Sequence, residues 1–145
     1  MRLNGKGVID LPVKLMVIVI IVSLSVPMLV GAMERGETNS ALSAMNAETD
    51  KLFSSVSAVH YSGIGSSRTV QVDLPDGCEI FIPGGSGSEG YSVKMFFKGG
   101  NVGTRYMDRP PVSFISDGMM ISGSCMLLIT SEIRDGYAAV KVTSL

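Results

Sequence analysis

The sequence predicts an α+β protein in which a long N-terminal helix precedes an antiparallel β-sandwich or a curled β-sheet. Two observations lead to this prediction. Residues 15–33 form an apolar run without a charged residue, and from Thr69 onward short segments alternate apolar and polar residues between turn-forming residues. The chain has 145 residues, which is enough for one modest globular core once the apolar run is set aside.

The apolar run has the length of a membrane span. It extends over roughly nineteen residues, about the number that a helix needs to cross the hydrocarbon core of a bilayer. Basic residues come before it (Arg2, Lys6 and Lys14), and a charge-balanced group follows it (Glu34, Arg35 and Glu37). We therefore expect a transmembrane helix over residues 8–33, with the N-terminus in the cytoplasm and the C-terminal domain outside. A secretory signal peptide cleaved near residues 30–32 and a buried core helix are the alternatives.

The residues before the helix resemble a known signal. A short polar leader ends in Lys6-Gly7 and is followed at once by Val8 and the apolar run. This order resembles the class III signal of type IV pilins and archaeal pilin-like proteins. The resemblance implies that a prepilin peptidase removes residues 1–7 as a cytoplasmic leader by cutting after Gly7. Val8 would then be the first mature residue.

The resemblance also implies a function. The helix would anchor the subunit among membrane lipid and pack with other pilin-like subunits, and the β domain would serve subunit contacts or adhesion at the cell surface, including in a filament. Pro27 lies inside the apolar run, where pilin helices often carry a kink-forming proline. Pro12 stands at the fifth mature position, where bacterial pilins have glutamate, so the looser archaeal type is favoured. A simple membrane anchor carrying a monomeric extracytoplasmic binding module is the alternative.

Residues 34–62 are expected to extend the helix outward as an amphipathic segment. Apolar residues recur there at steps of three and four, which is typical of a helix with one buried face: Leu42, Met45, Leu52, Phe53, Val56 and Val59. Glycines at 63 and 65 then end the pattern. The expected β domain covers residues 63–145.

Strands are predicted wherever apolar and polar residues alternate between turns. Residues 69–74 and 78–82 flank Pro75-Asp76-Gly77 and are predicted to form a β-hairpin. Further strands are expected at 91–97, 102–107, 112–115, 119–121, 125–130 and 138–142. Several short strands separated by turns are typical of a sandwich or a curled sheet that packs on the amphipathic helix.

The sequence contains no convincing enzyme signature. Residues 85–90 match G-x-G-x-x-G, but a strand is expected after them, so the helix N-terminus that binds a pyrophosphate is missing. His60 is the only histidine and is expected at the end of the helix, and the carboxylates lack the spacing of a calcium loop. The formal net charge is −1, which argues against nucleic acid as a partner. We expect no catalytic residue, cofactor or metal.

Cys78 and Cys125 are the only cysteines, and each opens a predicted strand. In an exported domain, two cysteines favour a disulfide over a metal site, because metal sites usually have three or four ligands. Closing the loop of about forty-seven residues would stabilise the fold by roughly 4 kcal/mol on the chain-entropy model. The alternative is a pair of buried thiols.

Overall fold

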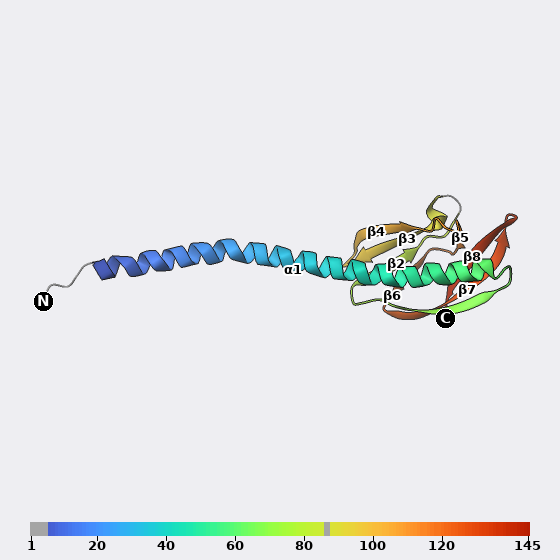
Figure 1. Ribbon diagram of the computed structural model, residues 1–145, viewed down its shortest axis with the longest axis horizontal. Coiled ribbons are helices and arrows are strands. Elements are labelled where there is room, and N and C mark those ends of the chain that lie inside the picture. The colour runs from blue at the N-terminus through green and yellow to red at the C-terminus, as the bar shows by residue number, and fades with distance from the viewer. Residues whose placement is uncertain (1–5, 86–87) are drawn as a thin grey trace. The chain divides into compact units, whose positions relative to one another are not determined.

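The structure is a computed structural model that describes residues 6–85 and 88–145. It is an α+β chain, as predicted, with one helix followed by strands and a short 3₁₀ helix (Figure 1). The elements are α1 (Lys6–Tyr61), β1 (Ser67–Asp73), β2 (Cys78–Ile82), η1 (Ser88–Tyr91), β3 (Ser92–Phe97), β4 (Gly100–Tyr106), β5 (Ser113–Ile115), β6 (Met119–Ser122), β7 (Ser124–Arg134) and β8 (Tyr137–Ser144). The chain divides into two compact units between Thr38 and Asn39, which are described separately below.

The first unit consists of the N-terminal part of α1. All of its large apolar side chains from Leu11 to Met33 are exposed, with exposed fractions between 49% and 78%. This stretch is long and apolar enough to cross a membrane. A helix that is apolar all round, with no protein covering it, is suited to surroundings other than water.

The second unit begins with residues 39–61 of α1, which contribute one helix face to the core. Met45, Leu52 and Val56 are buried to 1% exposure or less, and Ala41 and Val59 are also buried. This confirms the predicted apolar face, although Leu42 and Phe53 are only partly buried at its margin. Thr49 is a buried polar residue on this face, and its hydroxyl donates to the Met45 carbonyl at 2.8 Å.

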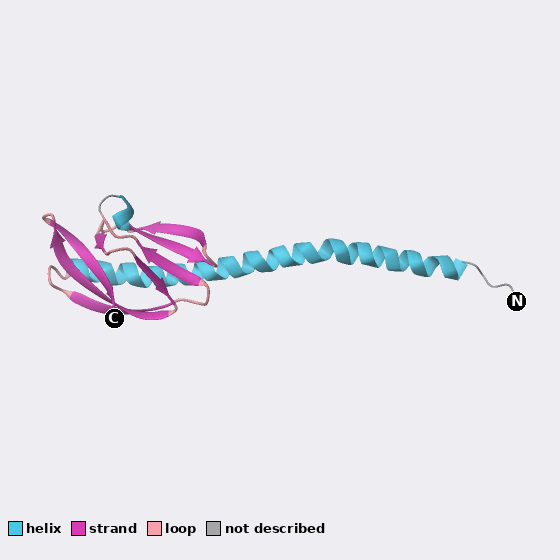
Figure 2. Cartoon of the chain, turned by 180° about the vertical axis from the view of Figure 1, so that it is seen from behind, coloured by secondary structure: helices cyan, strands magenta, loops and turns pink. Residues whose placement is uncertain are grey.

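Two four-stranded sheets surround the core of this unit (Figure 2). One sheet has the order β1-β7-β8-β5 and the other has the order β4-β3-β2-β6. All pairs are antiparallel except β5 with β8. Alternate residues of β2 (Cys78, Ile80 and Ile82) and of β7 (Leu127, Ile129 and Ser131) are buried, as the period of two requires.

The predicted hairpin between residues 69–74 and 78–82 is wrong. Both strands exist, but β1 pairs with β7, whereas β2 pairs with β3 and β6 in the other sheet. The Leu74 side chain is buried, and its N–H donates to the Gly123 carbonyl at 2.9 Å. This hydrogen bond holds the end of β1 beside the start of β7. The turn at residues 75–77 therefore leads from one sheet to the other instead of closing a hairpin.

The true hairpins lie elsewhere. β3 and β4 are joined by Lys98-Gly99, and β7 and β8 by Asp135-Gly136. Asp135 and Gly136 have φ values of 53° and 84°. Positive φ at both central residues is the requirement of a type I′ turn, whose twist matches that of the two strands.

The buried half of α1 also contacts an outer strand of each sheet. Arg105 on β4 donates to Asp50 Oδ1 at 2.6 Å and to the Asn46 carbonyl at 3.3 Å. On β1, the N–H of Asp73 donates to Glu48 Oε2 at 3.2 Å. The helix thus binds an outer strand of each sheet, through the Arg105 side chain on β4 and through a backbone N–H on β1.

Candidate functional site

The exposed part of α1 contains two serines and two prolines, which change the hydrogen bonds made by its backbone carbonyls. Pro12 and Pro27 lie inside α1. Pro27 has no N–H, so the carbonyl of Ser23, four residues earlier, loses its usual donor. The Ser23 hydroxyl donates to the Val19 carbonyl at 2.7 Å, and the Ser25 hydroxyl donates to Ile21 at 2.7 Å. Neither hydroxyl therefore serves the carbonyl that the proline leaves open.

The predicted processing residues, Gly7 and Val8, lie in the first turns of α1, which begins at Lys6. Most of the predicted leader, residues 1–5, lies outside the described residues. The predicted cut after Gly7 therefore stays a prediction.

The two cysteines lie on different sheets and have free thiols. Cys78 opens β2 and is buried, whereas Cys125 lies near the start of β7 and is partly buried. Both side chains pack against the same core. Burial raises the pKa of each thiol, and the Asp73 carboxylate raises that of Cys125 further. Because both thiols belong to one core, the predicted disulfide would link the two sheets, and it stays a prediction.

The glycine-rich segment at residues 85–90 leads into no α-helix. Its residues 86–87 lie outside the described part of the chain, and the four-residue η1 and then β3 follow. Gly84, just before it, is constrained by packing, since a Cβ there would lie 1.4 Å from the Ser116 carbonyl oxygen. Within residues 6–85 and 88–145, no group of three or more His, Cys, Asp or Glu residues could hold a metal ion.

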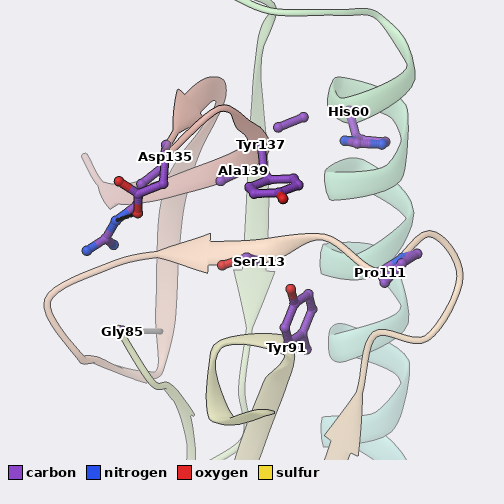
Figure 3. Close-up of a pocket in the computed structure, with 10 residues that line it drawn as sticks. His60, Gly85, Tyr91, Pro111, Ser113, Asp135, Tyr137 and Ala139 are labelled. Atoms are coloured by element: carbon purple, nitrogen blue, oxygen red, sulfur yellow. Dashed lines mark ion pairs between the residues drawn. The ribbon is translucent and has the colours of Figure 1, made fainter. Parts of the chain in front are cut away.

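A cavity of about 360 Å³ lies in the second unit, and sequence reasoning did not predict it (Figure 3). Its polar and aromatic lining comes from five elements and the β7–β8 turn: His60, Tyr91, Ser113, Arg134, Asp135 and Tyr137. His60 was singled out in the sequence as the only histidine and lies in the last turn of α1, as expected. The tyrosines gave no such signal, because the strand pairing that gathers them cannot be read from their spacing.

The lining has a distinct geometry. Tyr91 ends η1, where its carbonyl accepts from the Met107 N–H at 2.8 Å. Tyr137 follows the β7–β8 turn and is 79% exposed. In Figure 3 the hydroxyl of Tyr91 points toward the Tyr137 ring, and Ser113 lies on the strand between them. The site is therefore an open hollow with two aromatic faces.

Comparison with known proteins identifies no relative: no family model matches this chain, and neither curated proteins nor solved structures give a significant match.

Proposed function

We propose that this chain is a pilin-like structural subunit, anchored by its N-terminal helix and displaying its β unit at the cell surface. One observation carries the proposal. The same helix, α1, exposes every large apolar side chain from Leu11 to Met33 and then buries one face in a β core. The resemblance of Lys6-Gly7 to a class III signal implies an N-terminal helix that anchors the subunit in the membrane and packs with other subunits, and the exposed half of α1 supports this.

The exposed span of α1 would be costly to leave in water. Apolar surface costs roughly 25 cal/mol for each Å² left in water, so a continuous apolar helix requires lipid or neighbouring helices around it. Basic residues before the span and balanced charges after it favour a cytoplasmic N-terminus and an extracytoplasmic β unit.

The Ser23 carbonyl favours neighbouring helices over lipid alone. Lipid cannot donate a hydrogen bond, and the hydroxyls of Ser23 and Ser25 are already committed to other carbonyls. A polar group from an adjacent copy of the helix would satisfy it. In this proposal the span is built to pack with other subunits after a prepilin peptidase has cut behind Gly7.

A monomeric, membrane-anchored binding module is the second candidate, and the cavity beside Tyr91 and Tyr137 favours it. Such a module needs the anchor but needs neither processing nor helix packing. The two candidates therefore differ in the N-terminus of the mature protein and in contacts between copies.

Processing is tested by N-terminal sequencing and intact-mass measurement of protein extracted from its native membrane. We expect the mature chain to begin at Val8, and Gly7→Leu to block cleavage while membrane insertion persists. Retention of residues 1–7, or a start near Met33, would contradict pilin-type processing.

Helix packing is tested by single cysteines introduced along residues 17–29 in a chain whose two native cysteines are replaced by alanine. We expect crosslinks between copies at positions on one or two helix faces. Arg68→Cys, on an exposed position of β1, measures random collision. Crosslinking that is absent, or equal at every position, would favour the binding module.

A further inference from the structure

The cavity of the second unit combines two aromatic faces with hydrogen-bonding groups and little net charge. Arg134 and Asp135 both line it, with 3.9 Å between Arg134 Nε and Asp135 Oδ2. Their opposite charges offset each other. A strongly anionic or cationic ligand would gain little there, so the lining favours a neutral ligand.

Polar atoms of the lining remain available to such a ligand. Nδ1 of His60 is buried and has no hydrogen-bond partner within the part of the chain that the structure describes. A buried polar nitrogen without a partner is costly, but this atom has almost no accessible surface, so the polar groups open to a ligand are those of the other lining residues. The hydroxyls of Ser113 and Tyr91 face the same hollow (Figure 3).

Two further hollows continue from this cavity. A hollow of about 450 Å³ shares Arg134 and Gly85 with it and is also lined by Phe81. A third, of about 510 Å³, shares residues 115–118 with the second. Neighbouring hollows share lining residues and follow one another along β5 and the loop after it, and the three together are called the track below. A track of this kind suits an elongated ligand.

We propose that this track binds a neutral oligosaccharide, with one sugar ring held between Tyr91 and Tyr137. The C–H face of a sugar is apolar and lies flat on an aromatic ring, while its hydroxyls both donate and accept hydrogen bonds. Arg134 offers donors, Asp135 offers an acceptor, and Ser113 offers both. The inference rests on the proposed function in one respect, since only a displayed β unit would meet extracellular glycans.

A peptide is less well suited to the same surface. An extended peptide binds chiefly by backbone pairing with an open strand edge and by side-chain pockets. Here the outer strands beside the hollows, β5 and β6, are only three and four residues long, and the second hollow is lined largely by loop residues at 83–85 and 116–118. A sugar chain needs no strand edge, so the lining favours the glycan.

The test uses the full-length chain in detergent on a printed array of neutral, sialylated and sulfated oligosaccharides, with an unstructured Gly/Ser peptide as a further probe. Affinity for the best neutral glycan is then measured by tyrosine fluorescence, since the chain has four tyrosines and no tryptophan. Tyr137→Ala should weaken binding roughly tenfold, and Tyr137→Phe should stay within about threefold, because the ring supplies the stacking. Tyr106→Ala is the matched control, since Tyr106 is 57% exposed and lies outside the track.

Selective binding of a neutral glycan that Tyr137→Ala weakens and Tyr106→Ala does not would support the inference. Absence of neutral binders, preference for sulfated glycans or for the peptide, or equal loss in both variants would overturn it. These outcomes are separate from those of the proposed function. A chain that binds glycan but keeps residues 1–7 would refute the pilin-like subunit and leave the glycan site standing.

Discussion

Truncating a helix side chain should destabilise the β unit, because α1 supplies part of its core. Leu52 is 1% exposed and belongs to the same buried cluster as residues from both sheets. Leu52→Ala removes the equivalent of about three methylene groups at about 0.8 kcal/mol each, and the remaining cavity adds to this loss. We expect the free energy of unfolding to fall by about 3 kcal/mol. Helix propensity does not contribute, since alanine is the better helix former.

The assay is urea unfolding of the full-length chain in detergent, followed by far-UV circular dichroism and by tyrosine fluorescence, which reports on the sheets. Phe53→Ala should cost less, about 2 kcal/mol, because this ring is only partly buried, stacks on Phe114 at 6.3 Å and lies under Arg105. Ser54→Ala is the control, since Ser54 is exposed on the same helix turn. A Leu52→Ala midpoint equal to that of the control, or a loss of helix signal alone, would refute the shared core.

Three other predictions follow from single contacts. Gly84→Ala should destabilise by at least about 3 kcal/mol, because its Cβ would overlap a backbone carbonyl oxygen at 1.4 Å, which cannot be relieved by a side-chain rotation. Hydrogen bonds from Ser124 and Gln71 lower the pKa of Asp73. The ionised Asp73 therefore stabilises the folded chain above the unfolded pKa near 4, and this stabilisation is lost as pH falls through the lower folded pKa. The urea midpoint of Ser124→Ala should therefore depend less on pH below about 4 than the wild-type midpoint does. Cys78 should resist iodoacetamide at pH 8 until the chain unfolds, because burial raises its pKa and the thiolate is the reactive form.

Gly36→Ala has open space around its Cβ and should leave stability unchanged or raise it by about 1 kcal/mol, so equal loss in both glycine variants would contradict the packing argument. Identical pH profiles for wild type and Ser124→Ala would remove the role assigned to that hydroxyl. Rapid alkylation of folded Cys78 would show that its strand opens readily. Two thiols that stay unreactive in urea until a reductant is added would establish the predicted disulfide.

Local periodicity predicted the elements well because each element's burial follows its own period. The helix face of Met45, Leu52 and Val56 recurs at steps of three and four, and the strand at residues 78–82 alternates; both are buried as expected. Pairing could not be read in the same way. Pro75-Asp76-Gly77 has the composition of a hairpin turn, but the partner of β1 is fixed by long-range contacts such as that of Leu74 with Gly123.

The candidate glycan site depends entirely on such long-range contacts. His60 and Tyr137 are far apart in sequence, and they line one cavity because β8 pairs with β7 and β5 in the unit that also contains the end of α1. Tyr137 had the signature of an ordinary strand residue. Only its place after the Asp135-Gly136 turn, opposite Tyr91, gives the ring a function to propose (Figure 3).

Exposure has opposite meanings in the two halves of α1. In residues 41–59, one apolar face is buried by the chain's own sheets, so its demand for apolar contact is met within a single copy. From Leu11 to Met33 the apolar residues cover the whole circumference, and their large side chains are exposed. Lipid can satisfy the side chains of this span, but it cannot satisfy the carbonyl that Pro27 leaves open. The backbone, more than the hydrophobicity, is therefore the feature on which the proposed packing with other copies and a simple anchor differ, and crosslinking along residues 17–29 tests it.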